Sequence, residues 1–119
     1  MSAPYPLTLE TPRLILHLAD PTNEEDCNRI IQIYNDPYAS RGGNARVGIN
    51  TIADVRAKDA AYRPRKELCT KIDCEMDRMY HLAYLKDSNG QQSDLIGFVG
   101  MSFRPEVQYP DLGYALLGP

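Results

Sequence analysis

The chain has 119 residues, enough for one compact domain and too few for two ordinary ones. Hydrophobic residues make up 43% and charged residues 24%, which excludes a chain that stays disordered for lack of a core. The net charge of −3 excludes a global basic field that would attract nucleic acid or anionic lipid. We therefore expect neither nucleic acid nor a membrane as a partner.

The amino-terminal residues and the cysteines indicate a cytoplasmic protein. Residues 1–6 lack the basic segment and following apolar stretch of a secretory signal, and no run approaches the ~20 apolar residues of a membrane-spanning helix. Cys27, Cys69 and Cys74 are odd in number and too few to cross-link a small secreted fold, so we expect reduced thiols.

A strand and a helix are the first elements predicted. Residues 11–18 alternate in character, which predicts a strand with one buried face. That face carries Leu14, Leu16 and Leu18. Thr22 and Glu25 then have the spacing of a capping box that opens a helix, which ends before Asp36-Pro37. The apolar stripe of this helix consists of Cys27, Ile30, Ile31 and Tyr34.

A loop and a second helix follow. Residues 40–50 contain three glycines, which permit positive φ and interrupt any regular periodicity. Thr51 is a suitable N-cap, and Asp54 a favourable first-turn residue, for an alanine-rich helix that runs to Tyr62. Residues 63–78 have no clear pattern, and we expect mostly irregular structure there.

Three consecutive strands complete the pattern. Residues 79–86 are apolar on both faces, as in a strand covered from two sides. The Asn89-Gly90 turn signal joins them in a hairpin to residues 95–103, and residues 112–117 form a third strand. This order predicts an α+β fold, with a mixed, mainly antiparallel sheet and two N-terminal helices packed on it.

General catalytic and metal-binding motifs are missing from the sequence. It contains no phosphate-binding loop, dinucleotide fingerprint, zinc-protease motif or nucleophile elbow. Cys69 and Cys74, taken with His81, match no standard zinc spacing, so we expect no metal site.

Tyrosines and one basic loop are the remaining candidates for binding. Tyr34, Tyr38 and Tyr114 either line a substrate groove or serve as half-buried packing residues. The loop from Arg41 to Arg46 carries two cations and two glycines, so it either grips an acidic group or is a solvated loop.

Five segments, taken in order, carry a resemblance to a known family. They are Thr11-Pro-Arg-Leu-Ile-Leu, Tyr34-Asn-Asp-Pro, Tyr80-His-Leu-Ala-Tyr, Leu95-Ile-Gly-Phe-Val-Gly and Asp111-Leu-Gly-Tyr-Ala-Leu-Leu. Together they resemble the GNAT superfamily of N-acetyltransferases, and most of all its ribosomal-protein-alanine N-acetyltransferase-like branch. The resemblance implies that residues 1–119 form a GNAT domain that is incomplete at its C-terminus.

The same resemblance implies a reaction and a cofactor. Acetyl-CoA would be the co-substrate, and a primary amine of a small molecule or a protein N-terminus would accept the acetyl group. The pantetheine arm would lie along residues 111–118 and bond to their backbone as an added strand does. Amides at the strand end would bind the cofactor and polarise the thioester carbonyl, which assigns Leu116, Leu117 and Gly118. The acceptor site would include Tyr34, Tyr38, Arg41 and Tyr114.

A base must also take a proton from the attacking ammonium, because only the neutral amine is a nucleophile. Asp111 and Glu106, near the start of the last strand, are the carboxylates closest to the expected site. Each is either this base or a solvated charge at the strand end.

The family's glycine-rich pyrophosphate loop would come directly after Pro119. We therefore expect the chain to be the amino-terminal part of an N-acetyltransferase, inactive or weakly active alone. The alternative is a non-catalytic binding or assembly module that uses its last strand. Self-association is expected through that strand, because an open edge at Leu116-Leu117 recruits other strands.

Overall fold

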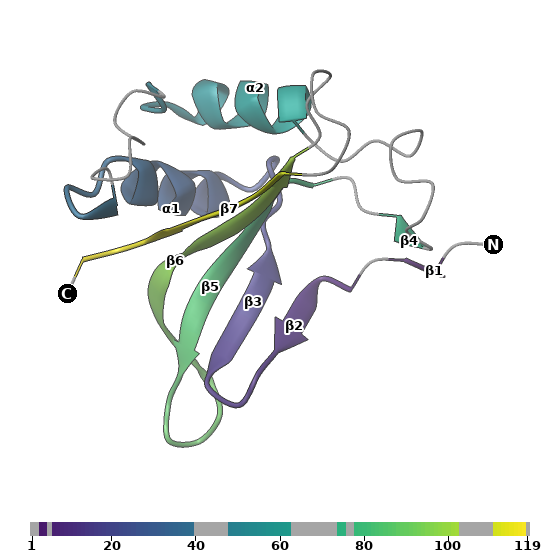
Figure 1. Ribbon diagram of the computed structural model, residues 1–119, viewed down its shortest axis with the longest axis vertical. Helices are drawn as coiled ribbons and strands as arrows, with labels where there is room; N and C mark the ends of the chain where they lie inside the picture. The colour runs from purple at the N-terminus through teal and green to yellow at the C-terminus, as the bar shows by residue number, and fades with distance from the viewer. Residues whose placement is uncertain are drawn as a thin grey trace.

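The computed structural model describes residues 3–4, 6–39, 48–62, 74–75, 78–102 and 111–118. Its main sheet has five antiparallel strands in the order β2-β3-β5-β6-β7, and two helices pack on one face of it (Figure 1). The predicted α+β class is therefore confirmed. The strands are β2 (Thr8–Glu10), β3 (Leu14–Leu18), β5 (Tyr80–Lys86), β6 (Gln92–Ser102) and β7 (Asp111–Leu116), and the helices are α1 (Glu24–Tyr34) and α2 (Ile52–Tyr62).

A second, smaller sheet lies apart from the main one. It consists of β1 (Ala3–Pro4) and β4 (Cys74–Glu75), which pair in parallel. In Figure 1 this pair stands to the right of the main sheet, near the N-terminus. The sequence pattern predicted neither strand, because each is only two residues long.

Helix α1 begins one residue later than predicted. The side chain of Asn23 accepts a hydrogen bond from the Asp26 amide at 3.1 Å and caps the helix. Thr22, the predicted cap, instead donates from its amide and its hydroxyl to Asp20 Oδ1, at 2.9 and 2.7 Å. The carboxylate of Asp20 thus holds Thr22 in the turn before the helix.

Helix α2 begins as predicted. Thr51 Oγ1 accepts from the Asp54 amide at 3.1 Å, and Asp54 Oδ2 accepts from the Thr51 amide at 2.9 Å, which is a reciprocal capping arrangement. Val55 is buried against the core, and the buried carboxylate of Asp59 accepts from the Met79 amide at 2.9 Å. This bond attaches α2 to the chain just before β5.

The core lies between the helices and the sheet. Tyr80, Leu82 and Phe98 point from the sheet toward α1, and their side chains are buried. The rings of Tyr34, Tyr80 and Phe98 pack with centroids 5.1 to 6.3 Å apart, and the hydroxyls of Tyr34 and Tyr80 are hydrogen-bonded at 2.9 Å. The predicted stripe of α1 is largely buried, with Ile33 in the place expected for Ile31.

The predicted orientation of β3 is wrong. Ile15 pairs with Tyr84 of β5, and both side chains lie on the helix side of the sheet. Leu14 and Leu16 lie on the opposite face and are half-buried, and of the three leucines only Leu18 is fully buried. Alternation shows that a strand has two different faces, but the position of the helices decides which of them is covered.

The predicted hairpin between β5 and β6 is confirmed. Its turn is held by Asp87 Oδ1, which accepts from the amides of Asn89 and Gln91 at 2.8 and 2.9 Å. Gly90 has φ 76°, a conformation that glycine adopts without steric cost. Strand β6 begins at Gln92, three residues earlier than predicted, and this extends the ladder to Lys86.

Candidate functional site

Strand β7 has one backbone edge that faces away from the rest of the main sheet. Strand β7 ends the strand order, with β6 as its neighbour among the described strands. The Leu117 amide donates to the Ile96 carbonyl at 2.8 Å, so odd-numbered residues turn their backbone groups to β6 here. Because successive residues of a strand direct these groups to opposite sides, the amides and carbonyls of Leu112, Tyr114 and Leu116 point outward. We call these groups the outer edge.

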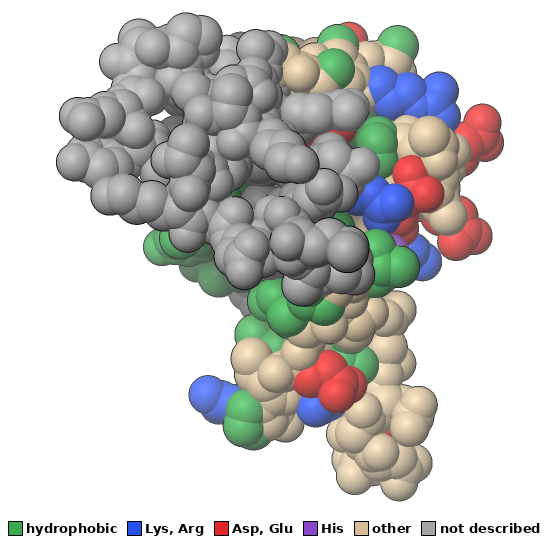
Figure 2. All heavy atoms as spheres, turned by 90° about the vertical axis from the view of Figure 1, so that its right-hand side faces the viewer, with side chains coloured by type: hydrophobic (Ala, Val, Ile, Leu, Met, Phe, Trp, Pro, Cys, Tyr) green, Lys and Arg blue, Asp and Glu red, His purple; other side chains and the backbone are tan. Residues whose placement is uncertain are grey.

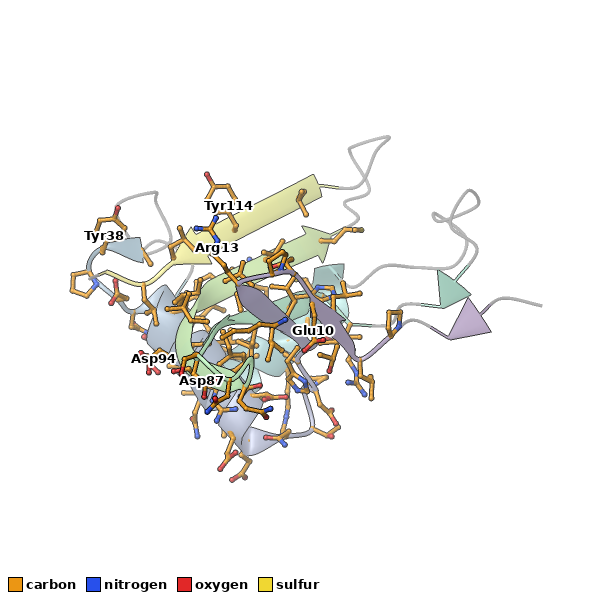
Figure 3. The ribbon with its side chains drawn as sticks, turned by 90° about the horizontal axis from the view of Figure 1, so that it is seen from below. Glu10, Arg13, Tyr38, Asp87, Asp94 and Tyr114 are labelled. Carbon is orange, nitrogen blue, oxygen red and sulfur yellow. The ribbon has the colours of Figure 1, made fainter. Side chains whose placement is uncertain are left out.

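The open face of the sheet, opposite α1 and α2, is also apolar. Figure 3 shows Tyr114 projecting from β7 on the side away from the helices. A hollow of about 150 Å³ lies on this face. It is lined by Leu9, Leu16, His81, Val99, Gly100, Met101 and Leu112. In Figure 2 hydrophobic side chains lie along the middle of the molecule, and acidic and basic ones lie both at the upper right and among the lower side chains.

His81 is the polar side chain of this hollow. It is 7% exposed, and burial, with a smaller effect of His17, lowers its pKa below the ordinary 6.5. A neutral imidazole among leucine, valine and methionine side chains makes the hollow suited to an apolar group rather than to an anion.

Asp36 fastens the end of β7 to the loop after α1. Its Oδ1 accepts hydrogen bonds from the amides of Tyr38, Ala39 and Gly118, at 2.9, 3.0 and 3.2 Å. The bond from Ala39, together with those from Gly118 and Tyr38, lowers the pKa of this carboxyl. Asp36 is therefore a fixed anion at the outer end of the strand, and its depressed basicity makes it a poor proton acceptor at neutral pH.

The tyrosines predicted for the acceptor site lie in three different environments. Tyr34 is buried in the core, and its hydroxyl is hydrogen-bonded to that of Tyr80. Tyr38 is exposed and packs beside Gly118, close enough that a Cβ at Gly118 would press on its side chain. Tyr114 is 75% exposed on the open face. The structure thus places Tyr38 and Tyr114 at β7 and assigns Tyr34 to packing. Arg41 lies outside the described residues.

The three backbone amides predicted to bind the cofactor differ in the direction of their N–H groups. The Leu117 amide is bonded to Ile96, and the Gly118 amide to Asp36. The Leu116 amide belongs to the outer edge. Of the three amides assigned from the resemblance, Leu116 is thus the one whose N–H points away from β6 and from Asp36.

One of the two predicted base candidates, Asp111, belongs to the opposite end of this strand. Asp111 pairs with Ser102 at the beginning of β7, five residues from Leu116, or about 17 Å at the rise of an extended strand. Glu106 lies outside the described residues.

A second polar cluster surrounds the start of α1. Asp26 is buried; its Oδ2 accepts from the Asp20 amide at 2.9 Å and lies 3.3 Å from His17 Nε2, and its Oδ1 lies 3.5 Å from an Arg29 nitrogen. The adjacent Cys27 is fully buried, as predicted, and burial raises the pKa of its thiol. The carboxylate of Asp26, through its contact with His17, holds α1 to β3. The buried thiol of Cys27 is not an accessible nucleophile.

Asp36 is the site residue that sequence reasoning missed. Its only local signal is the Asp-Pro pair, which also marks the end of a helix.

Within residues 6–39, 48–61, 78–101 and 112–118, no group of three or more metal-ligand side chains is found. No helix in the described part of the chain is long and apolar enough to cross a membrane.

No family model matches this chain, and no curated protein or solved structure matches it either.

Proposed function

We propose that the outer edge of β7, with the loop after α1, is the acyl-binding edge of an N-acetyltransferase of the GNAT type. Acetyl-CoA binds with its pantetheine arm along β7, and the acetyl group passes to a primary amine. The observation that supports this most is the row of backbone groups on β7 that points away from β6, at one end of the antiparallel sheet. In the chain, both helices come between β3 and β5. The sequence resemblance supplies the reaction.

The chemistry of pantetheine suits this edge. The arm is an extended chain with two amide groups, which can exchange hydrogen bonds with outward N–H and C=O groups as a peptide strand does. Leu112 and Tyr114 offer such groups, and in this proposal the Leu116 amide donates to the thioester carbonyl. A donor that meets the developing oxyanion stabilises the transition state more than the ground state.

The loop after α1 supplies the wall next to the thioester. Asp36 holds Gly118 against Tyr38, so the exposed ring of Tyr38 lies beside the strand end where the acetyl group would be placed. The negative charge of Asp36 attracts an ammonium group to this end, which favours a protonated amine as the arriving acceptor.

The test is a titration of the isotopically labelled chain with acetyl-CoA, followed by the amide signals of β7. We expect larger shifts at Leu112, Tyr114 and Leu116 than at Gly113 and Ala115, because only the first set faces the ligand. Adenosine 3′,5′-bisphosphate, which lacks the pantetheine arm, is the matched control and should leave β7 unchanged. Equal shifts with both compounds, or none with acetyl-CoA, would contradict the proposal.

A further inference from the structure

The outer edge of β7 has apolar side chains at the same residues whose backbone groups point away from β6. Leu112, Tyr114 and Leu116 are 68%, 75% and 47% exposed. In the register with β6, Leu112 is opposite Met101 and Tyr114 opposite Val99, so these side chains share the open face. One strand therefore combines backbone groups that point away from β6 with exposed apolar side chains.

The opposite edge of the main sheet is different. Strand β2 has only three residues, and its Glu10 lies 4.0 Å from the Lys86 ammonium. Short length and charged residues are ordinary devices that keep an edge from pairing with another chain. Strand β7 is longer, and residues 112–118 include no charged side chain. The sheet thus has one protected edge and one edge without these devices.

We propose that two copies of this chain pair antiparallel through β7 about a two-fold axis at Tyr114. Tyr114 then lies opposite Tyr114 of the second copy, and Leu112 lies opposite Leu116. The two-fold axis makes the Leu112–Leu116 pair occur twice, so there are three pairs. Each pair uses outward-facing backbone groups and exchanges two hydrogen bonds, about six in total. A register shifted by one pair keeps only about four of them. The dimer uses the same backbone groups as the proposed binding of acetyl-CoA, so the two would compete for this edge, and the inference stands without that binding.

The composition of the strand favours a second copy as the occupant. A two-fold interface brings identical residues together at its axis, so a charge at the centre would repel itself. Tyr114 is uncharged, and an aromatic pair across two strands is favourable. The flanking Leu112 and Leu116 are similar in size and polarity, which suits a surface that must match itself. The pairing is small, so the dimer forms reversibly and depends on concentration.

Sedimentation velocity over a concentration series, with charge variants at the axis, tests the proposal. The unmodified chain should form a growing fraction of dimer, whereas Tyr114→Lys and Tyr114→Glu should each stay monomeric because like charges meet. An equimolar mixture of these two variants should form dimer again, because opposite charges then meet at the axis. Leu85→Lys, on the same face but in β5, is the matched control and should behave like the unmodified chain.

A cross-linking experiment keeps the test informative if a charge variant folds poorly. Opposed residues of a hydrogen-bonded antiparallel pair have Cα atoms about 5.5 Å apart, within the range of a disulfide. Tyr114→Cys should therefore give a covalent dimer under mild oxidation, and Leu85→Cys should not. Four results would overturn the proposal: a monomeric unmodified chain at all concentrations, undiminished dimer in both charge variants, no dimer on mixing them, or equal cross-linking of the two cysteine variants.

Discussion

The two faces of the main sheet differ sharply, although the same strands form both. On the helix side, Leu82 and the rings of Tyr80 and Phe98 are almost completely buried against α1. On the open face, Leu85, Leu112 and Tyr114 are 40% to 75% exposed. Apolar side chains stabilise a fold only where they are removed from water, so the residues of the first face contribute more to stability than these exposed residues of the second.

The largest expected effect separates these two faces directly. Leu82→Ala removes a fully buried side chain and leaves a cavity, which should lower the free energy of unfolding by about 2–5 kcal/mol. Leu112→Ala removes a mostly exposed side chain and should change it by less than about 0.5 kcal/mol. Urea denaturation of dilute samples measures both values. Similar losses for the two variants would mean that the open face also carries the fold.

A smaller effect is expected where β6 and β7 approach each other. A Cβ at Gly97 would collide with the backbone oxygen of Ala115, so Gly97→Ala must push the two strands apart. We expect a loss of about 1–3 kcal/mol, as for overpacking in a core. Gly113→Ala is the matched control in the same strand pair, because its Cβ would have no atom within 4 Å. Thermal unfolding compares them, and equal melting temperatures would exclude close contact at Gly97.

The hydrogen bond between the hydroxyls of Tyr34 and Tyr80 gives a further test of the helix side of the sheet. Burial raises the pKa of both Tyr34 and Tyr80, so both remain protonated donors and acceptors at neutral pH. Tyr34→Phe leaves the Tyr80 hydroxyl without this partner and should cost about 1–3 kcal/mol. The double variant with Tyr80→Phe should lose less than the sum of the single losses. Strict additivity in this double-mutant cycle would show that the two hydroxyls do not interact.

The smallest expected effect is a pH dependence from the end of β7. In the folded chain, the hydrogen bond from Ala39, with those from Gly118 and Tyr38, lowers the pKa of Asp36 below its ordinary value of 3.8. The unfolded chain then binds the proton more tightly, so this stabilisation is present above about pH 4 and is lost as the pH falls through the folded value. Asp36→Asn should flatten the acid limb of the stability curve. Identical acid limbs for Asp36→Asn and the unmodified chain would contradict the role of Asp36.

Much of the fold could be predicted because it depends on local patterns. The apolar stripe of α1, the capping residues of α2 and the turn at Gly90 all lie within a few residues of the structure they determine. Strand β2 was missed because three residues give no measurable alternation. The face of β3 was misassigned because leucines on one side and Ile15 on the other are equally apolar, and the packing of distant helices decides between them.

The candidate site was less predictable because its contacts are far apart in sequence. Asp36 binds the amide of Gly118, 82 residues away, and no local pattern reports such a contact. Tyr34 was placed near the acceptor by resemblance, although its position on the apolar stripe of α1 already favoured the core. The last strand was found correctly, but its two backbone edges become distinct only when β6 is known to lie on one side.

Amide hydrogen exchange along β7, measured by NMR, tests the two-sided character of this strand most directly. An open outer edge predicts slow exchange at Gly113, Ala115 and Leu117 in dilute samples and fast exchange at Leu112, Tyr114 and Leu116. At concentrations where the dimer forms, the second set should become protected as well. Uniform protection of all six amides in dilute monomer, or uniformly fast exchange, would contradict the open edge on which both proposals depend.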